Sequence, residues 1–345
     1  MNFSKIIIRW YHQNKRDLPW RHTADPYKIW LSEIILQQTR VQQGLPYYEK
    51  FTRKFPTVHR LAKAKEDEVM KAWQGLGYYS RARNLHHTAK YISNELKGKF
   101  PNDYETIKSL KGIGEYTAAA IASFAFHKPH AVVDGNVFRV LSRYFGTATA
   151  IDSTEGKKEF TRKANLLLDK KDPGTFNQAM MEFGAMQCVP QNPDCRKCPL
   201  KKGCVALKKK RVNDLPVKSK KTKVRTRYFN YFLIRSKGRT LIQKRHEKDI
   251  WNGLYEFPLV ETNSPLQERK LKVSAKAASK NFKHLLSHQI IFARFWEVKT
   301  LSAQLKKIIR IDKKISFYVN DNQLFKYAFP KLILNYFDET GFKKI

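Results

Sequence analysis

The chain has 345 residues, of which 42% are hydrophobic and 13% aromatic, so it is too long for one domain of ~100–200 residues and favours two domains with sizeable cores. Lys and Arg number 67 against 30 Asp and Glu, and the net charge of +37 predicts a polyanionic partner, although a basic proteome or plain solubility is the simpler explanation. No apolar run approaches the ~20 residues of a membrane span, and residues 1–17 lack a signal-peptide cleavage site, so we expect an intracellular protein.

Helical spacing of apolar residues predicts an all-α region that begins at residue 3. Asp25 and Pro26 are suited to the N-cap and first position of a second helix, over residues 25–38. Further helices are predicted at residues 65–73, 81–96, 102–110, 116–126, 135–145, 157–169 and 175–188.

The character of the sequence changes near residue 205. Residues 201–227 hold twelve Lys or Arg and one acid without apolar periodicity, which indicates a basic linker suited to lie along a phosphate backbone. Strands are predicted at residues 227–245, around a turn at 236–239, and at 288–298 and 314–320; residues 274–282 and 321–337 are predicted to be helical. We therefore expect an all-α domain at 1–205, a linker at 206–226 and an α+β domain at 227–345.

Glu33 is the one acid in an otherwise apolar helical run, residues 30–36. A carboxylate in such surroundings loses hydration unless a partner holds it. An arginine partner would make Glu33 structural. Without one, apolar surroundings raise the pKa of the carboxyl and suit it to acid catalysis.

Gly112 and Gly114 lie between two short predicted helices. Glycine allows a turn with φ > 0 and a close backbone approach, and the free N–H groups of the helix that starts near Glu115 suit a phosphate. An ordinary packed corner is the plainer interpretation. Asp134 is likewise open to two interpretations, an N-cap of the following helix or a carboxylate held for chemistry at the helix start.

All four cysteines lie within 17 residues, at Cys188, Cys195, Cys198 and Cys204. A disulfide framework would spread them along the chain, so their clustering predicts a metal site. The spacing C-x6-C-x2-C-x5-C has only one of the two knuckles usual in a zinc ribbon, and it also suits a [4Fe–4S] cluster. Spacing alone leaves both open.

Together and in this order, the glycine hairpin, the downstream Asp and the cysteine loop resemble the endonuclease III superfamily of DNA glycosylases, over about residues 5–205. The resemblance implies an all-α helix-hairpin-helix fold in which Gly112 and Gly114 grip DNA and the four cysteines hold a [4Fe–4S] cluster. Strand-cutting members carry a lysine where this chain has Tyr116, and a phenol cannot form the Schiff base. Residues 30–41, 75–85 and 132–140 resemble the adenine-specific MutY family.

That family resemblance implies roles for individual residues. Glu33 would protonate N7 of adenine and Asp134 would stabilise the sugar cation, with Tyr116 and Asn136 assisting in the pocket. Gln38 and Tyr78 match residues that wedge into the base stack while the target base is flipped out, although Tyr78 would also suit simple packing in a turn.

The C-terminal domain resembles a MutT-like (Nudix) fold at residues 242–261. The R-E-x-x-E-E box that would hold Mg²⁺ is missing from residues 262–280, which disfavours triphosphate hydrolysis. MutY proteins carry such a domain to recognise 8-oxoguanine through a Phe-Ser-His loop. Here the loop reads Leu286-Ser287-His288, so Leu286 departs from the pattern while Ser287 and His288 keep it.

The sequence thus predicts a monofunctional glycosylase that removes adenine opposite 8-oxoguanine or guanine from double-stranded DNA. It predicts a monomer in the cytoplasm or nucleoid, with no membrane partner. A bifunctional glycosylase/lyase for oxidised pyrimidines is the alternative, which Tyr116 disfavours. A non-catalytic DNA-binding protein is disfavoured by the presence of both Glu33 and Asp134, and a Nudix hydrolase by the missing box.

Overall fold

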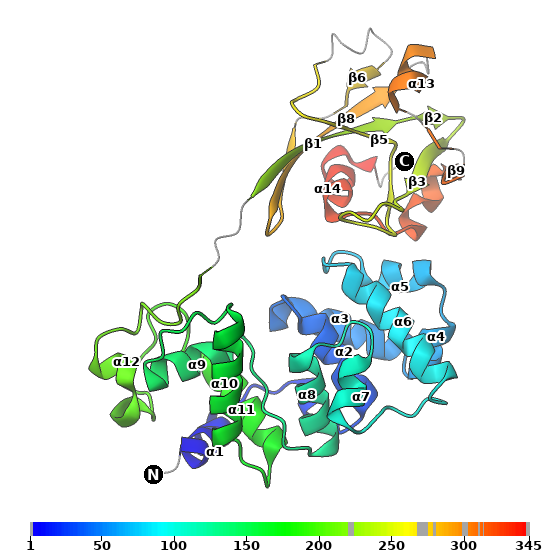
Figure 1. Ribbon diagram of the computed structural model, residues 1–345. Helices are drawn as coiled ribbons and strands as arrows, with labels where there is room; N and C mark the ends of the chain where they lie inside the picture. The colour runs from blue at the N-terminus through cyan, green and yellow to red at the C-terminus, as the bar shows by residue number, and fades with distance from the viewer. Residues whose placement is uncertain are drawn as a thin grey trace. The chain divides into compact units, whose positions relative to one another are not determined.

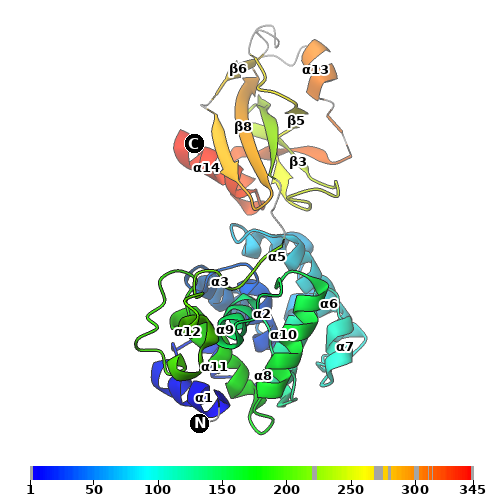
Figure 2. The same ribbon diagram turned by 60° about the vertical axis from the view of Figure 1, so that its left-hand side comes forward.

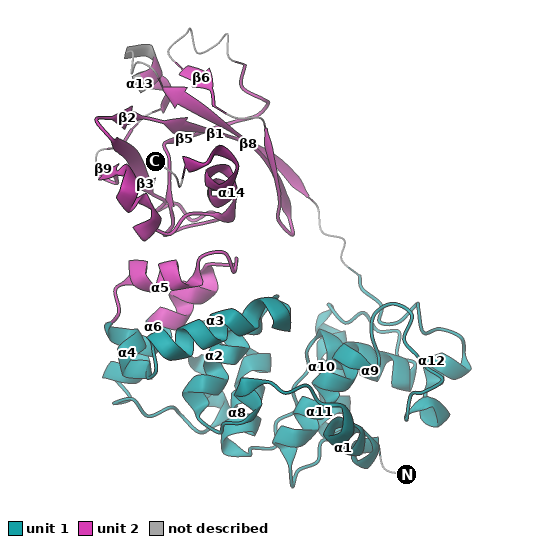
Figure 3. Ribbon diagram, turned by 180° about the vertical axis from the view of Figure 1, so that it is seen from behind, with its two compact units in different colours: residues 1–63, 87–220 teal, residues 64–86, 221–345 magenta. Residues whose placement is uncertain are grey.

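The computed structural model describes residues 3–219, 224–267, 275–278, 281–298, 303–309, 311–312 and 314–342. The chain forms two compact units, and neither is one continuous stretch (Figure 3). Unit 1 contains residues 1–63 and 87–220, and unit 2 contains residues 64–86 and 221–345. None of the helices in the described ranges is long and apolar enough to cross a membrane.

Unit 1 is helical, as predicted for the N-terminal region (Figure 1). All the expected helices form, and three more, α3, α4 and the short α12, were not predicted. The elements up to residue 208, including those of the 64–86 segment, are α1 (Phe3–Asn14), η1 (Pro19–Arg21), α2 (Pro26–Leu36), α3 (Val41–Lys54), α4 (Val58–Lys63), α5 (Glu66–Trp73), α6 (Ser80–Asn94), α7 (Tyr104–Ser109), α8 (Glu115–Phe126), α9 (Gly135–Phe145), α10 (Thr154–Leu167), α11 (Pro173–Met186), η2 (Lys201–Gly203) and α12 (Val205–Lys208).

Local capping explains where the helices near the site begin. Asp25 accepts a hydrogen bond from the Tyr27 backbone N–H at 2.9 Å, and Pro26 occupies the first turn of α2. α8 carries apolar and small residues on nearly every side, so it is buried through most of its length. One core of unit 1 joins α1, α9, α10 and α11 through residues that include Ile7, Leu141, Phe160 and Phe183.

The basic segment predicted as a linker is attached to unit 1 over much of its length. The Arg143 guanidinium Nε donates to the Leu215 carbonyl at 3.1 Å, and the Ile151 N–H donates to the Val217 carbonyl at 3.0 Å. Ser219 donates from its backbone N–H and hydroxyl to the Asp152 carboxylate. Residues 220–223 of the predicted linker lie outside the described residues.

Unit 2 contains two sheets (Figure 2). In the larger sheet the order is β5-β1-β8-β6, with β7 also paired to β8; in the smaller it is β2-β3-β4, with β9 paired to β3. The strands are β1 (Arg225–Leu233), β2 (Arg235–Ser236), β3 (Arg239–Lys244), β4 (Tyr255–Glu256), β5 (Leu259–Thr262), β6 (Ala275–Ala277), β7 (Phe282–Leu285), β8 (Gln289–Val298) and β9 (Ser316–Asn320). The predicted strands are confirmed.

The predicted helices of unit 2 needed correction. Residues 275–277 of the expected 274–282 helix form strand β6, because they pair with Trp296–Val298 of β8; residues 274, 279 and 280 lie outside the described residues. The expected 321–337 helix is divided, since η4 (Asp321–Lys326) ends before an extended stretch and α14 (Lys331–Thr340) follows. The other helix described in this unit is α13 (Ala303–Ile309).

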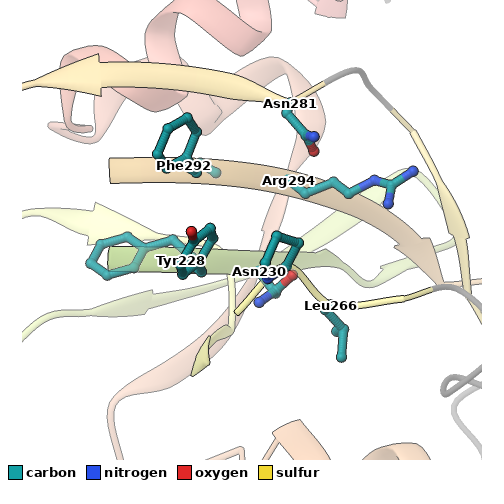
Figure 4. A pocket seen from close by; sticks show the side chains of 9 residues that line it. Tyr228, Asn230, Leu266, Asn281, Phe292 and Arg294 are labelled. Atoms are coloured by element: carbon teal, nitrogen blue, oxygen red, sulfur yellow. The ribbon is translucent and has the colours of Figure 1, made fainter. Parts of the chain in front are cut away.

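The two faces of the larger sheet differ. On one face Phe295 of β8 stacks on Tyr336 of α14 with ring centroids 3.9 Å apart. On the other, Tyr228 and Phe292 are cross-strand neighbours whose rings stack beside a cavity (Figure 4). The described residues that line this cavity include Arg294 but no acid, so they offer no carboxylate to a divalent cation.

Candidate functional site

Glu33 lies in the middle of α2 and is 6% exposed. Burial is the largest influence on its carboxyl and raises its pKa to about 7. The nearby Asp134 carboxylate also raises this pKa, whereas a hydrogen bond with Tyr116 lowers it. Glu33 is therefore a buried acid that still carries its proton in a large share of molecules at neutral pH.

Asp134 is both an N-cap and a neighbour of Glu33. Its carboxylate accepts hydrogen bonds from the backbone N–H groups of Asn136 at 2.9 Å and Val137 at 2.8 Å, at the start of α9. The Asn136 side-chain amide donates a third at 2.8 Å. Burial raises the pKa of Asp134, and these three donors and the Arg139 charge oppose the rise. The two interpretations of Asp134 from the sequence are thus compatible.

The glycine hairpin places Tyr116 at Glu33. α8 begins at Glu115 with Gly114 as its N-cap, so Tyr116 lies in the first turn. Burial and the two acids raise the pKa of the Tyr116 phenol well above its usual value, which keeps it a neutral hydrogen-bonding group. Of the two glycines, Gly112 adopts the left-handed backbone that glycine allows, with a φ of +84°, whereas Gly114 is extended, with a φ of −97° and a ψ of −179°.

A small cavity opens beside Glu33. Its lining combines flat apolar groups with polar side chains. The other lining residues are Trp20, Arg21, Ile29, Ser32, Phe124, Gln178 and Met181.

Sequence reasoning missed a second buried glutamate near this cavity. Glu182 is 1% exposed and accepts from the guanidinium groups of Arg16 at 2.6 Å and of Arg21 at 2.8 Å. Burial opposes the charge of Glu182, but the hydrogen bonds from both arginines lower its pKa to about 2. The partners of these two ion pairs are 166 and 161 positions apart in the sequence, so no local sequence pattern predicts them.

The four cysteines line one cavity. Four thiolates around one space suit either a tetrahedral zinc ion or an iron–sulfur cluster. Arg143 donates to the Cys188 sulfur at 3.5 Å and to the Val189 carbonyl at 2.7 Å, which fixes one side of the loop.

A chain of hydrogen bonds runs from the cysteine loop to Asp134. The Arg139 guanidinium donates to the Cys188 carbonyl at 2.7 Å and to the Asn136 side-chain oxygen at 2.9 Å, and Asn136 donates to Asp134. α9 and α11 meet closely here, because a Cβ at Gly184 would lie 2.9 Å from the Asn136 carbonyl oxygen. Arg139 was not singled out in the sequence.

The two residues expected to enter the base stack both have strained backbones. Gln38 of unit 1 and Tyr78 of unit 2 have φ values of +56° and +47°, in the left-handed region that favours glycine. Gln38 is exposed just after α2, and the Tyr78 ring is 48% exposed. Such strain at exposed side chains is consistent with a functional constraint.

Within unit 2, the predicted recognition loop lies at Tyr78. The Tyr78 and Ser287 hydroxyls are hydrogen-bonded to each other, and both line one cavity with Leu286 and His288. Ser287 and His288 are exposed, as a contact with another molecule requires. The structure thus brings together three residues predicted from distant parts of the sequence.

Comparison with known proteins agrees with this geometry. Residues 31–167 match the HhH-GPD superfamily of base excision DNA repair proteins, and residues 230–339 match the NUDIX domain. An adenine DNA glycosylase of Buchnera aphidicola subsp. Schizaphis graminum is 36% identical over 83% of this chain and 84% of its own length. The human adenine DNA glycosylase is 44% identical over 59% of this chain and 39% of its own length.

Among solved structures, a thermostable thymine-DNA glycosylase is similar, with a TM-score of 0.56 and 34% identity over 60% of this chain and 95% of that one. An endonuclease III–DNA complex, at 22% identity over 60% of this chain and 94% of that one with a TM-score of 0.52, shares the fold. At 83% of this chain, the match to the Buchnera enzyme is too long to lie within either matched domain alone. The chain belongs to the adenine DNA glycosylase family.

Proposed function

We propose that the protein hydrolyses the N-glycosidic bond of adenine in double-stranded DNA, where adenine lies opposite 8-oxoguanine or guanine. One observation carries the proposal: Glu33, with a pKa raised to about 7, shares a buried site with Asp134 and is hydrogen-bonded to Tyr116. Loss of a purine needs a proton donor for the base and an anion for the sugar, and this pair supplies both.

In the proposed reaction the Glu33 carboxyl gives its proton to N7 of adenine. The bond between C1′ and N9 then breaks, and its electron pair leaves with the neutral base. The oxocarbenium-like sugar is stabilised by the Asp134 carboxylate, which Asn136 orients through a 2.8 Å hydrogen bond. Water adds to C1′ and gives a proton to the Glu33 carboxylate, which regenerates the acid and completes the hydrolysis.

Strand cleavage is not part of the proposal. A lyase step requires an amine that attacks C1′ and forms an imine, and the position after the hairpin where such an amine would stand is Tyr116. Borohydride, which reduces imines, should therefore trap no covalent complex with DNA. Efficient trapping through a pocket lysine would contradict a monofunctional reaction.

Contacts to DNA follow from the hairpin and from charge. Gly112 and Gly114 with the N-terminus of α8 would bind backbone phosphate, and Gln38 and Tyr78 would fill the space that the flipped adenine leaves. The net charge of +37 predicts binding that weakens steeply with salt. On this proposal the protein acts as a monomer on DNA inside the cell, associated with the nucleoid.

Specificity must come from the opposite base, because adenine in a normal A·T pair is chemically identical to the target. 8-Oxoguanine differs from guanine by an oxygen at C8 and a proton on N7. The Ser287 hydroxyl can both donate and accept at that edge, and it is exposed beside Tyr78. We assign the readout to Ser287 and His288.

The cysteine loop would hold a [4Fe–4S] cluster through Cys188, Cys195, Cys198 and Cys204. The donor set of four thiols around one cavity supports this assignment. When bound, the cluster supplies four strong links that tie the loop into one rigid piece. Protein made with ample iron should contain about four irons and matching sulfide per chain, and stoichiometric zinc without iron would overturn the assignment.

The proposed function is tested on four duplexes, with adenine opposite 8-oxoguanine, guanine or thymine, and with thymine glycol opposite adenine. Single-turnover assays score abasic sites and strand breaks separately. We expect abasic sites from the first two duplexes, little from the third and none from the fourth, without strand breaks. Release of thymine glycol with strand cleavage would instead favour a bifunctional glycosylase/lyase.

A further inference from the structure

Helix α5 is held by the strands of the C-terminal domain, although residues 66–73 fall within the matched glycosylase range 31–167. Asp67 in its first turn accepts from the Lys244 ammonium at 2.6 Å with one carboxylate oxygen and from the Tyr255 hydroxyl at 2.7 Å with the other. Lys244 ends β3 and Tyr255 begins β4, so a single carboxylate joins α5 to two strands. We call Asp67, Lys244 and Tyr255 the α5 clamp.

Other contacts in unit 2 also join the segment from α5 into α6 to the C-terminal part of the chain. The Lys71 ammonium donates to the Tyr327 carbonyl at 2.9 Å, and the Arg83 guanidinium donates to the Asn252 carbonyl. Packing is close, because a Cβ added at Gly253 would lie 3.5 Å from atoms of both Glu66 and Met70. The segment from α5 into α6 is therefore bound at several points along its length.

These contacts bracket Tyr78. The clamp lies before Tyr78 in the chain and Arg83 lies after it, while the Tyr78 hydroxyl meets Ser287. The contact between Tyr78 and Ser287 is made by two exposed side chains on turns, and such a contact depends on the rigid elements that carry those turns. The α5 clamp fixes the helix before Tyr78 to β3 and β4. The loop between β3 and β4 in turn contacts β7, the strand before the Leu286–His288 loop, because the rings of Trp251 and His284 lie 5.7 Å apart.

We propose that Asp67 is a positioning residue for opposite-base recognition, which holds the Leu286–His288 loop at Tyr78 by binding Lys244 and Tyr255. The inference rests on the proposed readout by Ser287. Asp67 touches neither base nor sugar in this scheme. Its effect is on the geometry of the recognition loop, where small displacements weaken polar discrimination.

The test is a charge-swap experiment on the full-length protein. Asp67→Lys places a cation against Lys244, and Asp67→Lys with Lys244→Asp restores an ion pair of reversed polarity. Glu95→Lys, at an exposed turn residue just after α6 and outside the clamp, is the matched control for added positive charge. For each protein we compare single-turnover rates with adenine opposite 8-oxoguanine and opposite guanine at one salt concentration, and amide hydrogen exchange at residues 66–73 and 285–288.

Asp67→Lys should lower the preference for 8-oxoguanine about three- to fivefold and speed exchange in both segments, as expected for an exposed but multiply bonded pair. The swap should restore both readouts to within about twofold, and Glu95→Lys should change neither. General damage to the fold would not be repaired by the second substitution. Unchanged exchange at 285–288 in Asp67→Lys, or no restoration by the swap, overturns the proposal.

The readouts also separate this proposal from the proposed function. If the wild type does not distinguish 8-oxoguanine from guanine, the assigned specificity has failed, and hydrogen exchange alone then decides whether Asp67 holds the loop. If exchange responds and is restored while the preference of a discriminating wild type never changes, the clamp exists but does not position the readout, which also overturns the proposal.

Discussion

Two buried glutamates of unit 1 have opposite environments. Glu33, 6% exposed, has a carboxyl pKa raised from 4.5 to about 7, while Glu182, 1% exposed, has one lowered from 4.5 to about 2. The difference is the partners, since Glu182 is bound by two guanidinium groups and Glu33 by a neutral phenol. Burial therefore raises the pKa of a carboxyl towards the range of a catalytic acid only where no cation is paired with it.

The comparison can be expressed as free energy. A carboxyl whose pKa is higher in the folded than in the unfolded state is destabilising once it must ionise, and one whose pKa is lower is stabilising. For each glutamate, the pKa in the folded state differs from the unfolded value by an amount equivalent to about 3 kcal/mol in the free energy of unfolding. The difference is unfavourable for ionised Glu33 and favourable for ionised Glu182, so ionised Glu182 stabilises the fold and ionised Glu33 destabilises it.

The largest expected effect is on catalysis by Glu33→Gln. The amide keeps the shape of the side chain but cannot transfer a proton, so single-turnover excision should fall by a factor of at least ~10²–10⁴. Binding to the mispaired duplex should survive, because the substitution leaves the DNA-contacting surface intact. Near-normal excision would remove Glu33 from the reaction.

Glu182→Gln should give the largest loss of stability. It leaves Arg16 and Arg21 without their carboxylate in a largely buried setting, which costs about 3 kcal/mol in the free energy of unfolding at pH 7. Denaturant unfolding at pH 7 measures the loss. The contribution is present above pH 4.5 and disappears as pH falls towards 2, so the gap to wild type should narrow there.

A surface substitution calibrates that result. Glu159→Gln removes a glutamate that pairs with Lys163 at 2.6 Å on α10, where the Glu159 side chain is 27% exposed. Partial exposure to solvent should limit its effect to below about 1 kcal/mol. Equal losses from Glu159→Gln and Glu182→Gln would mean that the buried network has no special strength.

The contrast between Glu33 and Glu182 also explains which residues of the site could be predicted from the sequence. Glu33 and Asp134 were recognisable because their signals are local: an acid in an apolar helix, and a cap before a helix. Glu182 also lies in an apolar helix, but its partners are remote in sequence, and only the fold brings Arg16 and Arg21 to it. Sequence could single out the two acids proposed for catalysis, but not the ion-paired network of Glu182.

The wrong secondary-structure predictions also arose from contacts between residues that are distant in the sequence. Helix α3 was missed because Gly44 and Pro46 usually interrupt helices, yet packing keeps Val41–Lys54 helical. Residues 275–277, rich in Ala and Lys, have helical propensity, but pairing with an edge of β8 makes them a strand. In each case a tertiary contact outweighed the local preference.

Glu33→Gln should also make the protein more stable than the wild type at alkaline pH. In the wild type, stability should fall by up to about 3 kcal/mol as pH rises from 4.5 through 7, because ionising Glu33 in its buried site is unfavourable. The amide does not titrate, so the variant should become more stable than wild type at pH 8 and lose that advantage at pH 5. Parallel unfolding curves across this range would show that Glu33 ionises without penalty.

The smallest expected effect concerns the hydrogen bond between Tyr116 and Glu33. Excision should decline above about pH 7 as Glu33 loses its proton, tenfold per pH unit at the alkaline limit. The Tyr116 hydrogen bond lowers the pKa of Glu33, so Tyr116→Phe should raise that pKa and move the alkaline limb of the rate profile to higher pH, by less than about one pH unit. Tyr91→Phe, on an exposed part of α6, should leave the limb in place. If the alkaline limb moves to lower pH instead, the Tyr116 hydroxyl stabilises the protonated form of Glu33. The phenol would then not act on Glu33 as the two arginines act on Glu182, whose ionised form they stabilise.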